Sequence, residues 1–131
     1  MTVKRILSHL LCTLIIASAF VYTANAQKTY SDVKYGDWYY QSVYDMTNKG
    51  YMKGTSDTAF SPKSPMTRGM FVTVIAAIAN AETDNEKTGD FYDVARGKYY
   101  TGAVVWATEN GIISGTSKNY FSPDSYITRE Q

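Results

Sequence analysis

The sequence of 131 residues contains one cysteine, Cys12, and one histidine, His9. Both lie in the first 26 residues, which we expect to be removed as a signal peptide. The exported chain would then hold no thiol and no imidazole. That absence excludes a disulfide, a thiol nucleophile, a Ser-His-Asp triad and a metal site with histidine ligands.

The chain also lacks an excess of charge of either sign. It holds 13 Lys and Arg residues against 12 Asp and Glu residues. Loss of Lys4 and Arg5 with the leader leaves 11 basic residues against the same 12 acidic ones, a net charge of −1. Such a balance offers no electrostatic footprint for nucleic acid and no basic stripe for anionic lipid. We therefore expect no nucleic-acid partner and, after cleavage, no membrane partner.

No apolar run is long enough to favour a transmembrane anchor. The longest, Ile6 to Phe20, is interrupted by polar residues and falls short of the ~20 apolar residues that a spanning helix needs. It follows Lys4-Arg5 and precedes Ala24-Asn25-Ala26, which is the layout of a secretory signal peptide. The residues before Cys12 fit a lipidation site poorly. We expect cleavage after Ala26 and export.

An internal repeat organises the remaining chain, which is rich in tyrosine and also holds Trp38 and Trp106. Residues 30–69 align without a gap to residues 91–130, a shift of 61 residues. We assign residues 27–85 to a first repeat and residues 86–131 to a second. Identical pairs include Asp32/Asp93, Val33/Val94, Gly36/Gly97, Tyr39/Tyr100, Val43/Val104, Gly50/Gly111, Gly54/Gly115, Thr67/Thr128 and Arg68/Arg129.

Each repeat begins with a short amphipathic helix, indicated by apolar or small residues at three- and four-residue spacing around Val43 and Val104. Gly50 and Gly111 are predicted to end these helices as left-handed caps. A loop and a Phe-Ser-Pro turn follow. Because a residue before proline is biased toward an extended conformation, we expect one in each turn.

A second helix is predicted only in the first repeat. Thr67 is its expected N-cap, and its apolar stripe is expected to close the core of that repeat. The polar stretch from Ala81 to Asp90 is expected to be a solvated linker. In the second repeat the sequence stops at the start of the equivalent helix, where Thr128 and Gln131 form a capping box. We therefore expect this chain to be the N-terminal part of a longer protein.

The apolar stripe predicted for the second helix of the first repeat consists of Phe71, Val74, Ile75 and Ile78.

The ordered set FxDV, WYxxxV, a glycine loop, FxP and TR, found twice between Tyr30 and Gln131, resembles the S-layer homology domains of bacterial surface proteins. The resemblance implies a mainly α fold, with tandem helix-loop-helix repeats forming part of a pseudo-threefold helical bundle. It also implies non-covalent attachment to the cell wall through secondary cell-wall polysaccharide, often pyruvylated. The sequence departs from the family's usual TRAE ending, with TRGM in one repeat and TREQ in the other, and Trp38 becomes Tyr99 in the second repeat.

Arg68 and Arg129 each lie in a helix's first turn, where the macrodipole makes a cation unfavourable. The unpaired amides of a helix start attract anions, and a guanidinium adds a planar fork suited to a carboxylate. We therefore predict glycan binding by both arginines and by their caps. Replacing Arg68 by alanine is expected to remove affinity without changing the far-UV circular dichroism. The other predicted ligand residues are Thr67 and Thr128, the loop glycines Gly54 and Gly115, the stacking aromatics Trp38 and Tyr99, and Asp32 and Asp93.

Structural roles for the same residues stay open. Arg68 could instead pair with Asp32 or another carboxylate and hold a loop, and the aromatic residues could belong to the core. The two loop glycines could serve only a tight turn with positive φ. The two repeated aspartates could bond backbone amides. The acidic residues between Glu82 and Asp90 lack the spacing of a calcium loop, so we predict no metal site and no cofactor.

The sequence thus predicts a secreted module of the bacterial cell wall that binds an anionic glycan and performs no catalysis. The alternative is a protein-interaction module that assembles with itself or with other surface-layer proteins. A third alternative places an enzyme domain beyond Gln131.

Overall fold

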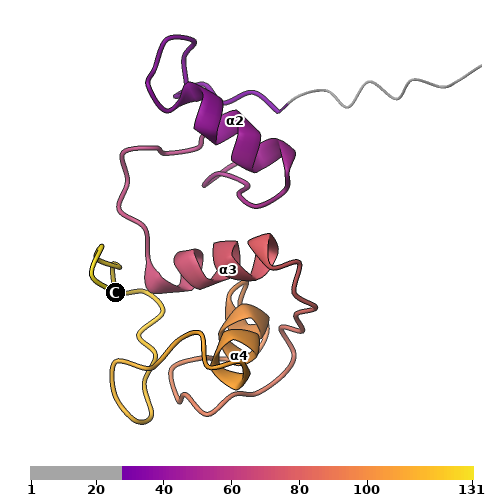
Figure 1. Cartoon of the computed structure of the whole chain (residues 1–131), viewed down its shortest axis with the longest axis vertical. Coiled ribbons are helices and arrows are strands. Elements are labelled where there is room, and N and C mark those ends of the chain that lie inside the picture. The colour runs from indigo at the N-terminus through magenta and orange to yellow at the C-terminus, as the bar shows by residue number, and fades with distance from the viewer. Residues whose placement is uncertain (1–27) are drawn as a thin grey trace, which may run out of the picture.

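The computed structural model describes residues 28–131, so the predicted signal peptide lies outside the described residues. Three helices form the regular secondary structure of this part: α2 (Tyr40–Asn48), α3 (Arg68–Ile78) and α4 (Thr101–Glu109), with no strand among them (Figure 1). The predicted mainly α class is confirmed. Within residues 28–131 no helix is long and apolar enough to cross a membrane.

Helices α2 and α4 occupy equivalent positions in the two repeats, since their bounds differ by the same 61 residues at both ends. Each ends before a glycine in the left-handed region, Gly50 with φ 75° and Gly111 with φ 66°. A left-handed residue after the last turn lets its amide bond a helix carbonyl, which ends the helix. The predicted pair of short helices and their glycine caps are confirmed.

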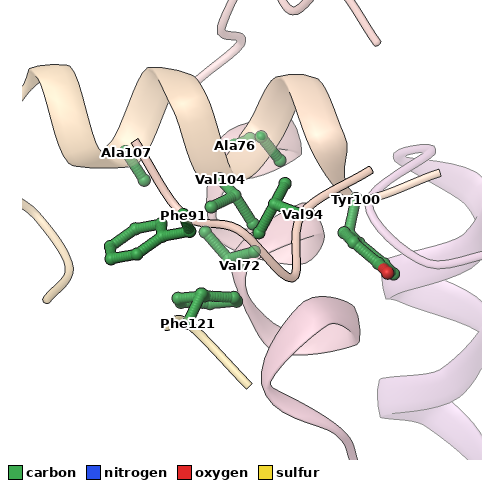
Figure 2. Close-up of a cluster of buried hydrophobic side chains, with 9 residues drawn as sticks. Val72, Ala76, Phe91, Val94, Tyr100, Val104, Ala107 and Phe121 are labelled. Atoms are coloured by element: carbon green, nitrogen blue, oxygen red, sulfur yellow. The ribbon is translucent and has the colours of Figure 1, made fainter. Parts of the chain in front are cut away.

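Helix α3 packs against the second repeat, although its sequence belongs to the first. Of the three described helices, only α3 and α4 are in contact. Val72 and Ala76 of α3 lie in one buried cluster with Val104 and Ala107 of α4 (Figure 2). The prediction that α3 closes the core of its own repeat is therefore wrong. The first repeat keeps a separate small core without α3, formed by Tyr30, Val33, Val43 and Tyr44.

The buried face of α3 also differs from the predicted stripe. The buried residues are Arg68, Gly69, Val72 and Ala76, whereas Phe71 is 37% exposed and Ile78 is 52% exposed. The helix RGMFVTVIAAI is apolar on nearly every side, so spacing alone does not identify the face that packs. Apart from Arg68, the buried residues of α3 have small side chains, which allows α4 and the second-repeat loop to approach closely.

The Phe-Ser-Pro turns do not have the predicted extended serine. Ser61 and Ser122 have φ 62° and 58°, both left-handed. Each serine hydroxyl bonds the hydroxyl of the preceding loop threonine at 2.7 Å, Thr55 in the first repeat and Thr116 in the second. Because left-handed residues other than glycine are strained, the surrounding contacts must hold this conformation.

The linker between the repeats is exposed to solvent over residues 82–90, as predicted, and hydrogen bonds also tie it to the second repeat. Asn85 Oδ1 accepts the Gly102 amide at 2.9 Å, and Asn85 O accepts the Gly97 amide at 2.8 Å. The first bond satisfies one of the unpaired amides at the start of α4, whose own N-cap residue offers no side-chain bond. The linker thus fixes where the second repeat begins.

Candidate functional site

Two repeated aspartates hold the Phe-Ser-Pro turns. Asp32 accepts the amides of Phe60 at 2.9 Å and Ser61 at 2.7 Å. Asp93 makes the same two bonds, at the same lengths, to Phe121 and Ser122. The alternative in which these carboxylates bond backbone amides is confirmed, and the bonds explain how each left-handed serine is held. Glycan contact by either aspartate stays a prediction.

The bonds at Asp32 predict a pH dependence of stability. The Phe60 and Ser61 amides hold the pKa of Asp32 below its ordinary value of 3.8. A carboxyl with a lower pKa in the folded state stabilises that state above the ordinary pKa, and the stabilisation is lost as the pH falls through the lower value. Asp32→Asn should lower the free energy of unfolding at pH 6. The difference in free energy of unfolding between Asp32→Asn and the unchanged protein should disappear as the pH falls below 3.8. Urea unfolding at a series of pH values measures this difference.

An exposed aspartate provides the control for this pH series. Asp90 is exposed in the linker, so Asp90→Asn should leave the pH profile unchanged. A gap for Asp32→Asn that stayed constant down to the lowest pH would contradict a role for the ionised carboxylate.

Gly54 and Gly115 are required by packing inside their own loops. A Cβ on Gly54, which has φ 75°, would lie 2.7 Å from the Ala59 carbonyl oxygen and 2.8 Å from the Tyr30 ring. A Cβ on Gly115 would lie 2.6 Å from the Phe91 ring. The alternative of a positive φ is confirmed for Gly54. At Gly115 the reason is close approach, because φ there is not in the left-handed region.

Arg68 joins the two repeats. Only 9% of the residue is exposed. Its Nε donates to Phe121 O at 2.8 Å, and its Nη2 donates to Ser114 O at 3.0 Å. Its guanidinium carbon lies 4.6 Å from the centroid of the Phe121 ring, within range of a cation–π interaction. All these contacts are in the second repeat, so one side chain links residues about fifty positions apart.

The alternative in which Arg68 pairs with Asp32 is wrong, while the idea that it holds a loop is confirmed. The ion pair in the described part of the chain joins Lys28 and Asp57, at 3.5 Å. Carbonyl oxygens take the place of the expected carboxylate. An arginine has five N–H donors, and these two bonds use one on Nε and one on Nη2. The other N–H donors of Arg68 make no hydrogen bond in the described part of the chain.

The start of α3 does not offer the unpaired amides that were predicted to attract an anion. The Arg68 amide donates to Ser125 O at 2.9 Å, and the Gly69 amide donates to Pro123 O at 2.8 Å. Thr67 is the N-cap, as predicted, and its side chain accepts the Met70 amide at 3.2 Å. Because carbonyl oxygens of the second repeat bond these two amides, the amides cannot also bind an anion. An anion site at this end of α3 would therefore depend on the Arg68 side chain.

A groove of about 470 Å³ lies beside Arg68, between α3 and the loop of the second repeat. Arg68 and Gly115, predicted as ligand residues in different repeats, both line it. Apolar side chains such as Phe71, Ile75 and Ile112 form much of the remaining wall. The groove therefore combines a nearly buried cation with apolar surface, an arrangement suited to a sugar ring that carries an acidic group.

The other predicted ligand residues are distributed over the molecule. Gly54 and Tyr99 line a second groove, of about 480 Å³, beside the loop of the first repeat. Trp38 is 91% exposed, so the alternative that it belongs to the core is wrong, and Tyr99 is 56% exposed. Thr128 and Arg129 lie exposed near the C-terminus, where Gln131 Oε1 accepts the Thr128 amide at 3.3 Å, as the predicted capping box requires.

Sequence reasoning missed the two partners of Arg68, Ser114 and Phe121. Both contribute a backbone carbonyl, which every residue carries, so no residue type marked them. The one available signal was that Phe121 belongs to a Phe-Ser-Pro turn found twice. Within residues 28–131 no group of three or more metal-ligating side chains lies together.

Comparison with known proteins adds a family to this geometry. Residues 29–69 and 90–131 match the family model of the S-layer homology domain. The chain is 29% identical over 126 residues to the S-layer protein sap of Bacillus anthracis. It is 33% identical over 104 residues to an amylopullulanase of Thermoanaerobacterium thermosulfurigenes, and 31% identical over 137 residues to an endoglucanase of Bacillus sp. (strain KSM-635).

The matches cover most of this chain and little of each relative. They include 96%, 79% and 98% of the chain, but 15%, 5% and 14% of the three relatives. The similarity is thus confined to a small part of much longer proteins with different names, and that part carries the repeats. These matches indicate a secreted protein of the bacterial cell surface. With two matching segments over more than half of its length, the chain belongs to the S-layer homology domain family.

Proposed function

We propose that this chain anchors an exported protein to the bacterial cell wall by binding an anionic secondary cell-wall polysaccharide, such as one carrying a pyruvate ketal. The groove beside Arg68 is the observation that carries this proposal. It brings together a nearly buried arginine with unused N–H donors and apolar walls. A carboxylate on a sugar ring matches both features, since the guanidinium binds the acid and the apolar walls pack against the ring.

The repeats act in this proposal as a binding module and have no catalytic role. The two relatives named as enzymes match this chain over only 5% and 14% of their own length. An anchor of this kind is compatible with different cargo, which agrees with the variety of the relatives' names.

Ile112 offers a test that leaves Arg68 in place. This residue lines the groove and is 47% exposed, so the fold should tolerate a polar side chain there. Ile112→Asp adds a negative charge to the groove wall, and like charges facing each other across an interface weaken binding strongly. We expect cosedimentation with wall sacculi to fall by about tenfold or more.

The matched control is Ile78→Asp, because Ile78 is 52% exposed on α3 and does not line the groove. Its binding should remain unchanged. Sacculi stripped of secondary polymer by acid extraction should bind neither variant nor the unchanged protein. Equal binding to intact and stripped sacculi, or equal binding by the two aspartate variants, would contradict the proposal.

A further inference from the structure

Two tyrosines of the second repeat, Tyr92 and Tyr120, form an exposed aromatic pair. Tyr92 is 76% exposed and Tyr120 is 51% exposed. Their ring centroids lie 6.0 Å apart and their planes are nearly perpendicular, at 87°, which is a favourable edge-to-face geometry. In the described part of the chain, the phenol hydroxyls that take part in hydrogen bonds are those of Tyr30 and Tyr44. The hydroxyls of the exposed pair are therefore open to a ligand.

Backbone hydrogen bonds hold both tyrosines in place. The Tyr92 amide donates to Asn119 O at 3.0 Å, which ties the start of the repeat to its loop. Tyr120 O accepts the Thr116 amide at 2.8 Å and the Ser117 amide at 3.2 Å. Because these bonds fix the backbone at both positions, binding at the pair would order little further chain and would lose little conformational entropy.

The first repeat shows that this part of the fold needs neither tyrosine. The equivalent residues are Ser31 and Ala59. The Ser31 amide donates to Thr58 O at 2.8 Å, and Ala59 O accepts two loop amides at 3.0 and 3.1 Å, so the same backbone bonds form. The tyrosines are thus additions to the surface of the second repeat. Contiguous exposed apolar surface of this kind often marks a contact with a partner.

Packing of one repeat against another does not account for the pair. Helix α3 and the second repeat line the groove beside the first-repeat loop, yet neither Ser31 nor Ala59 lines that groove, and Ser31 is exposed. In the second repeat, Tyr92 and Tyr120 do not line the groove beside Arg68. The pair therefore lies outside both grooves.

The chemistry of the pair fits an uncharged sugar ring. Tyrosine offers a flat apolar face, on which the C–H groups of a sugar can pack, and a hydroxyl that can exchange hydrogen bonds with sugar hydroxyls. The residues nearest to Tyr120 in the loop include the polar, uncharged Ser117 and Asn119, which pair with the backbone of the two tyrosines. An apolar face surrounded by neutral polar groups suits a saccharide better than an apolar peptide.

The pair is also continuous with the proposed binding groove. Phe121, the residue after Tyr120, lines the groove beside Arg68, and so does Gly115 at the start of the same loop. The groove wall and the aromatic pair thus belong to one short segment of chain. A polymer has many sugars in a row, so it can contact both surfaces of this loop at once.

We propose that Tyr92 and Tyr120 bind an uncharged sugar of the polysaccharide whose acidic sugar occupies the groove beside Arg68. The inference rests on the proposed function and adds a second contact to it. The first contact depends on the charge of the guanidinium, whereas the second depends on aromatic surface and hydroxyl groups. The second repeat would then recognise more than one sugar along the polymer.

Cosedimentation with wall sacculi tests the pair through the double variant Tyr92→Ser with Tyr120→Ala. These substitutions give both positions the residues of the first repeat, so the loop should fold, and circular dichroism checks this. Loss of both aromatic contacts should weaken binding about fivefold or more. The matched control is Tyr35→Ala, because Tyr35 is 91% exposed and lies outside both grooves. Its binding should remain unchanged.

Tyrosine nitration followed by mass spectrometry gives a readout that a merely structural role would not change. Tyr92 and Tyr120 should be nitrated in the free protein and protected in the protein bound to intact sacculi. Tyr35 should react equally in both states. Sacculi stripped of secondary polymer should give no protection.

Equal binding by the double variant and the unchanged protein would overturn the inference, as would equal nitration of the pair in the free and bound protein. Protection by stripped sacculi would overturn it too, since the partner would then be another wall component, such as a protein. If the unchanged protein binds intact and stripped sacculi equally, the proposed function fails and this inference fails with it. If it binds only intact sacculi and the double variant binds as well, this inference alone fails.

Discussion

Arg68→Ala is expected to lower the free energy of unfolding by about 3 kcal/mol, because truncation leaves two carbonyls without partners at a nearly buried site. The guanidinium bonds Phe121 O and Ser114 O and lies over the Phe121 ring. A charged donor to a buried acceptor is among the stronger hydrogen bonds in proteins, and the cation–π contact adds to the loss. Urea unfolding followed by circular dichroism measures the change.

The equivalent arginine of the second repeat is the matched control. Arg129 is exposed and donates to no carbonyl in the described chain, so Arg129→Ala should change the stability by less than about 0.5 kcal/mol. If Arg68→Ala and Arg129→Ala lower the free energy of unfolding by the same amount, the contacts of Arg68 do not provide the stabilisation assigned to them.

This result changes how a loss of glycan binding by Arg68→Ala should be interpreted. The sequence predicted lost affinity with an unchanged fold. The structure shows that the same side chain holds the second-repeat loop, so the variant can lose affinity through the loop alone. Ile112→Asp separates the two effects, since it alters the charge of the groove and keeps both bonds of Arg68.

Phe121→Ala is expected to lower the free energy of unfolding by about 3–5 kcal/mol, the range for removing a fully buried aromatic side chain. Its ring is 2% exposed and lies in the cluster that α3 shares with the second repeat (Figure 2). The centroid of the Phe91 ring is 5.7 Å away. Many single domains have only 5–15 kcal/mol of stability, so this loss should move the urea midpoint markedly.

Phe60→Ala is the internal control for this second change. Phe60 has the same position in the first repeat, and its amide is bonded by Asp32 just as Asp93 bonds the Phe121 amide. Phe60 is only partly buried, and its ring packs against the Tyr30 ring, with the two ring centroids 5.4 Å apart. We expect Phe60→Ala to lower the free energy of unfolding by about 2 kcal/mol, because Phe60 buries less apolar area than Phe121. Equal costs at the two positions would contradict the assignment of α3 to the core of the second repeat.

The placement of α3 also explains an arginine in the first turn of a helix. A cation there opposes the macrodipole by typically 0.3–1 kcal/mol. Carbonyl oxygens of the second repeat surround this end of α3 and bond both the backbone amides and the guanidinium. Their partial negative charge offsets the unfavourable dipole before any ligand binds. A glycan carboxylate would add to that effect at the unused donors.

The sequence by itself determined the features that depend on neighbouring residues. The repeat of 61 residues, the helices α2 and α4, the Gly50 and Gly111 caps and the Thr67 cap all follow from spacing and local hydrogen bonding, and all are present. Even Gln131 bonds the Thr128 amide as its spacing predicted. Such features need only a few residues in a row, so their chemistry can be seen in the order of the amino acids.

Only the tertiary structure decided which surfaces these elements share. Helix α3 is apolar on nearly every side, so its pattern fitted several packing faces, and the contact with α4 selected the one with small residues. The partners of Arg68 are backbone carbonyls 46 and 53 residues away. Every residue has a backbone carbonyl, so no residue type in the sequence identifies these partners. Contacts between distant residues depend on the whole arrangement of the chain, and for that reason the sequence identified the arginine but not the groove that it forms.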